Sequence, residues 1–143
     1  MNIELITELN IETFSEYYYA ELDGNKSNNI KNFLVEISKV FKFPDYFGFN
    51  VNALQECLND LDWLKEDNYV LHIRNYDQFL SEENSISRID ILELLDSTAE
   101  EWKNVPNFEG ENEFRKKADF KIIIERTKKS LYDIETLNNH RCS

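Results

Sequence analysis

The sequence predicts an α/β domain built on a small three-stranded parallel sheet with helices packed against it. Three short runs rich in aromatic or β-branched residues are the expected strands, at residues 17–22, 69–73 and 120–125. Stretches with apolar residues at helical spacing separate these runs, two before the second run and one after it. The resulting order β, α, α, β, α, β is typical of a parallel sheet joined by right-handed crossovers.

The expected strands differ in their surroundings. Residues 17–22 are rich in tyrosine and end at a turn-forming sequence at 23–25. Residues 69–73 are nearly all apolar, as expected of a strand buried on both faces of a parallel sheet. We therefore expect His72, which lies within this run, to be a core histidine whose hydrogen bonds are satisfied.

The first and last helices have start signals and core faces. We expect the first to begin at a cap on Ser27 or Asn28 and to run to about residue 41. We expect the last to cover about 86–103, with a variant of the capping box at residues 87–90. The buried side of the first helix is expected to comprise Ile30, Phe33, Leu34, Ile37, Val40 and Phe41.

The middle helix follows an aromatic loop, residues 43–49, and has two contrasting faces. Asn50 is expected to cap it, after a tight loop in which Gly48 stands where the backbone needs a positive φ. We expect this helix to reach about residue 61 and to bury an apolar arc, while a polar arc faces solvent or a partner. The apolar arc comprises Val51, Leu54, Cys57, Leu58 and Leu61. The polar arc comprises Asn52, Gln55, Glu56, Asn59 and Asp60.

Three segments carry weaker signals. Residues 1–15 mix weak apolar periodicity with acids, which fits a short strand or a docking segment. The connection at 104–119 is polar and long for a compact domain. The basic and sparsely apolar residues 126–143 fit a partly helical extension or a frayed tail. We divide the chain into an N-terminal extension, a central domain and a basic C-terminal extension, at 1–16, 17–125 and 126–143.

The composition indicates one domain with an acidic surface. The chain has 143 residues, of which 41% are hydrophobic, which is enough for a single core. Its net charge is −12, with −16 in residues 1–113 and +4 in residues 114–143. A field of this sign repels nucleic acid and attracts basic partners, so we expect no direct nucleic-acid binding by the main body. The alternative is that the acidity serves only solubility.

Other classes of protein find little support in the sequence. No apolar run is long enough to span a membrane, and the N-terminus lacks the regions of a signal peptide. Cys57 and Cys142 lie far apart, which indicates neither a disulfide nor a metal site and favours a reducing cytoplasm. There is no glycine-rich phosphate loop and no pairing of a nucleophile with a histidine. Asp60 and Asp62 are a thin ligand set for a cation, so we predict no enzyme, cofactor or metal.

The stretch from Pro44 to Leu54, PDYFGFNVNAL, resembles the barstar family, the intracellular inhibitors of secreted bacterial ribonucleases. The spaced pattern P-x-Y-x-G-x-N-x-x-A-L is specific because it fixes many positions within one turn and one helix. The sequences at 22–24 and 57–58 fit the same pattern. The resemblance covers about residues 17–125 and implies a three-stranded parallel sheet with packed helices.

The resemblance also implies that the aromatic loop and the polar arc enter the active site of a ribonuclease. Glu56 stands where the family carries its central acid, which takes the place of a substrate phosphate because phosphate-binding groups also bind carboxylates. Tyr46 matches an interface aromatic residue, with core packing as the alternative. Asn50 matches an interface asparagine, with helix capping alone as the alternative. We expect Phe47 and Phe49 mainly to pack, with exposure of Phe49 left open.

The polar arc departs from the family's pattern at several positions. Where Glu56 stands, the family commonly has the shorter aspartate. Asn52 falls where a second acid is frequent, and Gln55 falls where barstar has an aromatic residue. The charge pattern and a stacking contact are therefore altered, which leaves room for a different partner. Asn59 and Asp60 extend the surface, with a solvated helix face as the alternative.

We therefore predict a cytoplasmic immunity protein, monomeric when free, that binds a basic ribonuclease toxin and occludes its active site without turnover. The main alternative is a binding module of the same fold whose partner is a different toxin nuclease or a regulatory protein. A more distant alternative is a hydrolase that uses its acidic residues, Asp60 and Asp62 among them, with a metal.

Overall fold

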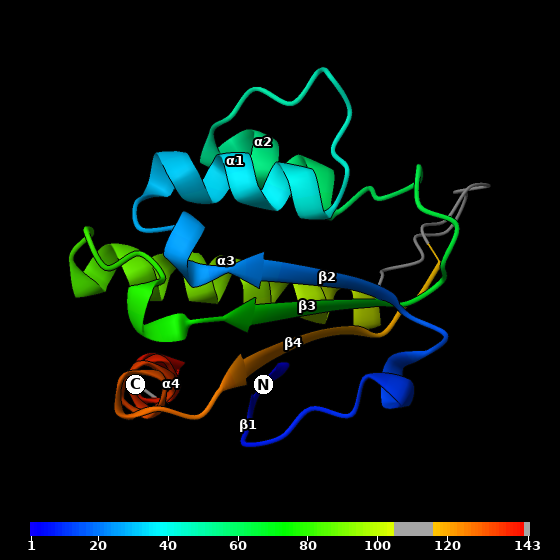
Figure 1. Ribbon diagram of the computed structural model, residues 1–143. Helices are drawn as coiled ribbons and strands as arrows, with labels where there is room; N and C mark the ends of the chain where they lie inside the picture. Colours follow the sequence, from blue (N-terminus) through cyan, green and yellow to red (C-terminus); the bar gives the residue numbers. More distant parts are fainter. Residues whose placement is uncertain (105–115, 142–143) are drawn as a thin grey trace.

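A four-stranded parallel sheet organises the computed structural model, which describes residues 1–104 and 116–141 (Figure 1). The strands are β1 (Ile3–Ile6), β2 (Tyr18–Asp23), β3 (Tyr69–Arg74) and β4 (Phe120–Glu125), in the spatial order β1-β4-β3-β2. Each neighbouring pair is parallel. The predicted α/β class and parallel sheet are confirmed, but the predicted number of three strands is wrong. The fourth strand, β1, pairs with β4 from Ile3 opposite Ile122 onward.

One face of the sheet carries the core. The helices are α1 (Ile30–Val40), α2 (Val51–Leu58), α3 (Ser85–Lys103) and α4 (Lys128–Arg141), with short 3-10 turns η1 (Ile11–Phe14), η2 (Gly24–Lys26) and η3 (Tyr76–Gln78). Alternate strand residues, such as Leu22, Leu71 and Ile122, form a single buried cluster with side chains of α1, α2 and α3. Figure 1 shows α3 behind the strands in that view. The helices therefore fix the aromatic loop and α2 to a rigid sheet.

The opposite face of the sheet carries a small polar network. His72, in register with Glu21 and Ile123, is 8% exposed, and its Nδ1 is hydrogen-bonded to the hydroxyl of Tyr19. Burial lowers the pKa of His72, because a charged imidazole would lose its hydration there. Beside it, Arg74 forms an ion pair with Glu21. The predicted burial and hydrogen bonding of His72 are confirmed, but the residue lies on the face of the sheet opposite the core.

Asparagines cap the starts of α1 and α3, but at other positions than the sequence predicted. α1 is capped by Asn29 and not by Ser27 or Asn28, the predicted caps. The Ser27 hydroxyl instead donates to the carbonyl oxygen of Asp23 at 3.1 Å. α3 is capped by Asn84, whose side chain accepts from the backbone N–H of Ser87 at 2.8 Å. The predicted capping box that opens at Ser87 is therefore wrong, because the cap lies three residues earlier, at Asn84. Asparagine is as good a cap as serine.

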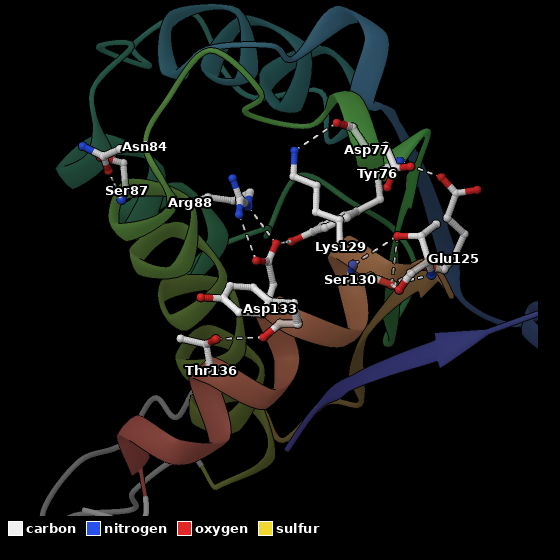
Figure 2. A network of polar contacts seen from close by, with 12 residues as sticks. Tyr76, Asp77, Asn84, Ser87, Arg88, Glu125, Lys129, Ser130, Asp133 and Thr136 are labelled. Carbon is white, nitrogen blue, oxygen red and sulfur yellow. Dashed lines mark hydrogen bonds and ion pairs between the residues drawn. The ribbon is translucent and has the colours of Figure 1, made fainter.

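Residues 126–141 contain a helix that docks on the core. α4 buries Ser130, Asp133 and Leu137, which lie on one helical face. Figure 2 shows Asp133 pointing from α4 toward Arg88 of α3 and Tyr76 of η3. Two of these three buried side chains are polar, which explains why apolar periodicity does not reveal the helix. The division into 1–16, 17–125 and 126–143 stays a prediction. β1 and α4 share the sheet and the core of the central segment.

Two further sequence features bear on the described residues. Most of the connection at 104–119 lies outside the described residues, because 105–115 are not described. Cys142 also lies outside them. In residues 1–104 and 116–141, no helix is long and apolar enough to cross a membrane.

Candidate partner-binding surface

The aromatic loop before α2 is anchored from below and exposed at its tip. The backbone N–H of Phe47 donates to the carbonyl oxygen of Pro44 at 3.0 Å, which closes a tight turn. The Phe47 ring is 5% exposed and meets the ring of Phe43 edge-on at 4.9 Å between centroids. In contrast, Tyr46 is 69% exposed and Phe49 is 55% exposed. The loop therefore presents two aromatic side chains to solvent on a packed base.

Asn50 caps α2, as predicted. Its Oδ1 accepts from the backbone N–H of Ala53 at 2.8 Å, and its Nδ2 donates to the carbonyl oxygen of Gly48 at 3.2 Å. The positive φ expected at Gly48 lies one residue later, where Phe49 has a φ of 51°. The Asn50 amide is thus engaged on both sides within its own loop, and a partner would meet it in a fixed orientation.

The two arcs of α2 largely separate as expected. Val51 is the exception on the apolar arc, because it occupies the first turn and is 37% exposed. α2 ends at Leu58 and not near residue 61, and Leu61 is buried beyond the helix with a left-handed φ of 53°. The remaining apolar residues, Leu54, Cys57 and Leu58, are buried. Burial raises the pKa of the Cys57 thiol, which keeps it neutral and inert.

The polar arc lies at the surface. Asn52, Gln55, Glu56 and Asp60 are exposed, and Asn59 is half-buried. Asn59 also caps the end of α2, since its Nδ2 donates to the carbonyl oxygen of Gln55 at 2.8 Å. The structure therefore brings the seven predicted site residues together on one loop and one helix, with Asn50 and Asn59 holding the two helix ends.

The carboxylate of Glu56 is exposed on this surface. Within residues 1–104 and 116–141, its side chain takes part in no hydrogen bond or ion pair. Residues 43–64 carry four carboxylates, those of Asp45, Glu56, Asp60 and Asp62, and no lysine or arginine. A carboxylate with no cation on its own segment is available to a cationic partner.

Tyr46 connects the loop electrostatically to the end of α2. The pKa of Tyr46 is raised by local desolvation and by the nearby carboxylate of Asp60. The pKa of Asp60 is also raised, by desolvation and then by the charge of Asp62. The phenol of Tyr46 at the loop tip therefore lies near the carboxylate of Asp60 at the end of α2.

Two exposed residues extend the surface beyond the predicted set. Phe49 was expected mainly to pack, and Val51 was expected to be buried, yet both add apolar area beside Tyr46. The sequence held a partial signal for them, since both lie at the boundary between the loop and the first helical turn. No group of three or more His, Cys, Asp or Glu side chains that could hold a metal is found in the part of the chain that the structure describes.

Comparison with known proteins supplies the family. The family model described as barstar (barnase inhibitor) matches residues 17–125, which is more than half of the chain. The matched span contains β2 to β4, α1 to α3 and the whole partner-binding surface, whereas β1 and α4 lie outside it. The comparison with curated proteins returned no match. The sheet, the aromatic loop and the matched span lead to one conclusion: the chain belongs to the barstar family.

Proposed function

We propose that this protein is a cytoplasmic immunity protein that binds a basic ribonuclease toxin and occludes its active site. The observation that carries the proposal is the position of Glu56, which is exposed and unpaired among the described residues at the centre of the polar arc. The family's description as barnase inhibitors supports a nuclease as the partner. No turnover is involved, because inhibition requires only that the active site be covered.

The mechanism begins with long-range attraction. The net charge of −12 draws a basic partner toward the protein and speeds their encounter at low ionic strength. The Tyr46–Asn50 loop and the Asn52/Glu56 face then enter the cleft together. There Glu56 engages the groups that bind the substrate phosphate, since such groups form charge-assisted hydrogen bonds with carboxylates as well.

The surface is preorganised for this contact. Phe47 is packed under the loop, and the Asn50 amide holds both the loop and the first turn of α2. Little of the backbone would have to be ordered on binding, so less of the interaction free energy is lost to conformational entropy.

The experiment is an RNA-cleavage assay with a panel of purified small basic ribonucleases. The panel includes barnase and any ribonuclease toxin encoded beside this protein. We expect the wild type to inhibit at least one of them and Glu56→Ala to inhibit it at least about tenfold less, since an unpaired charge in a closed interface costs about 1–3 kcal/mol. Glu135→Ala, which removes an exposed glutamate on α4, is the charge-matched control and should inhibit like the wild type.

Other outcomes point elsewhere. Equal inhibition by Glu56→Ala and the wild type would show that a different surface binds the ribonuclease. If no ribonuclease of the panel is bound, a module with a different nuclease or a regulatory protein as partner becomes the better reading. The amides at Asn52, where the family often has an acid, and at Gln55, where barstar has an aromatic residue, are the features that favour this second candidate.

A further inference from the structure

Exposed apolar side chains gather at the start of α2. Among the described residues, seven large hydrophobic side chains are exposed, and three of them come from residues 46–51. We call these three, Tyr46, Phe49 and Val51, the apolar shoulder. It adjoins the polar arc, because Val51 and Asn52 are consecutive in the first turn of α2. The surface therefore consists of the apolar shoulder and, next to it, the polar arc.

Phe49 is the member of the apolar shoulder with a left-handed backbone conformation. Its φ of 51° lies in the left-handed region, which a residue with a Cβ adopts at a cost. Glycine or asparagine would adopt this conformation more easily. The ring is not buried in return, since it is 55% exposed and only one side contacts Phe47, at 4.8 Å between centroids. Folding alone therefore gives little reason for phenylalanine here.

Resting on the proposed function, we propose that Phe49 is an apolar anchor for the same partner. The ribonuclease would present an apolar recess beside the cationic groups that receive Glu56. Aromatic side chains that fill a desolvated pocket near the centre of an interface often carry much of its binding energy. A backbone conformation of raised energy is also characteristic of functional positions. Phe49 would thus determine which basic ribonucleases bind to the polar arc.

The test separates binding from folding at this one position. Phe49→Gly removes the ring and relieves the left-handed backbone, whereas Phe49→Tyr keeps both the ring and the conformation. Affinity for the panel ribonuclease that the wild type inhibits most strongly is measured by calorimetry, and the unfolding temperature Tm is measured by circular dichroism. Lys42→Gly is the matched control, because Lys42 is also exposed and left-handed, with a φ of 54°.

We expect Phe49→Gly to bind at least about tenfold more weakly, as for a central aromatic contact, with a Tm within about 4 °C of the wild type. Phe49→Tyr and Lys42→Gly should bind within about twofold of the wild type. If Phe49→Gly binds as tightly as the wild type while Glu56→Ala does not, this inference is overturned and the proposed function stands. A large drop in Tm for Phe49→Gly would show that the ring serves folding and would also overturn it. If the wild type binds no ribonuclease, the proposed function fails and this inference falls with it.

Discussion

Arg88 holds Asp133 through two hydrogen bonds in the interior of the protein. The guanidinium Nε lies 2.7 Å from Oδ2 and Nη2 lies 2.9 Å from Oδ1, so the pair is bidentate. The hydroxyl of Tyr76 donates to the same carboxylate at 2.6 Å. Asp133 is fully buried and Arg88 is 8% exposed, so this contact joins α3, α4 and η3 away from water (Figure 2).

The first prediction concerns this buried pair. Asp133→Ala should lower the free energy of unfolding by about 3–5 kcal/mol, because Arg88 would remain buried without its counter-charge. Replacing both partners, as in Arg88→Met with Asp133→Leu, should cost less than either single change. Urea denaturation monitored by circular dichroism measures both. Glu135→Ala, on the exposed face of the same helix, should change stability by less than about 0.5 kcal/mol. A small loss for Asp133→Ala would contradict the role of the pair in docking α4.

The second prediction concerns His72 and pH. The pKa of His72 is lowered in the folded protein, while that of an unfolded histidine is about 6.5. Below pH 6.5 the unfolded state therefore binds more protons, so stability is complete above this pH and declines as pH falls toward the folded pKa. The slope from one residue cannot exceed about 1.4 kcal/mol per pH unit.

Denaturation curves from pH 7.5 to 5.5 measure this slope. His72→Gln, whose amide can still meet the hydroxyl of Tyr19, should lose the part of the pH dependence that comes from the imidazole. An unchanged slope in the variant would assign the effect to other groups.

The third prediction compares two glycines. A Cβ on Gly24 would lie 2.1 Å from the carbonyl oxygen of Asn75 and 2.7 Å from that of Arg74. Backbone cannot move aside as a flexible side chain can, so Gly24→Ala should cost at least about 2 kcal/mol of unfolding free energy. At Gly48 the nearest atom would be the side-chain nitrogen of Asn50 at 3.1 Å, and Gly48→Ala should cost less than about 1 kcal/mol. Equal thermal stability of the two variants would count against the close approach at Gly24.

The fourth prediction separates the two roles considered for Asn50. Asn50→Ala removes the acceptor for the N–H of Ala53 and should cost about 1 kcal/mol, whereas Asn50→Ser keeps a capping hydroxyl and should cost less. Thermal unfolding measures the cap, and ribonuclease inhibition measures the contact. If both variants inhibit poorly, Asn50 meets the partner directly. If only Asn50→Ala does, the residue acts by holding α2 in place.

The elements between β2 and β4 could be predicted because each carries its signal in its own residues. The apolar run of β3 and the Asn50 cap of α2 are examples. β1 could be offered only as a possible strand, because what makes it one is pairing with β4 at the far end of the chain. α4 could be offered only as a partly helical extension or a frayed tail, because two of its three buried side chains, Ser130 and Asp133, are polar and weaken the apolar stripe.

The residues of the candidate surface could be predicted from the sequence, but the exposure of each side chain could not. The spacing of Asn52, Gln55 and Glu56 places them on one face of any helix, and the structure has them exposed. The same spacing assigned Val51 to the core, but Val51 is the first residue of α2 and is 37% exposed, because burial depends on tertiary packing as well as on helical periodicity. That these residues meet a partner stays a prediction.

The pairing of β1 with β4 has a consequence for the protein while it is being synthesised. Of the four strands, β1 leaves the ribosome before the others, and the strand that receives it, β4, leaves after them. A nascent chain that already contains β3 therefore still lacks β4, the strand with which β1 pairs. Closing the sheet is a long-range and correspondingly slow step. The sheet is complete only after β4 has been translated, so a product that ends before β4 would expose the edge of β3 and invite proteolysis.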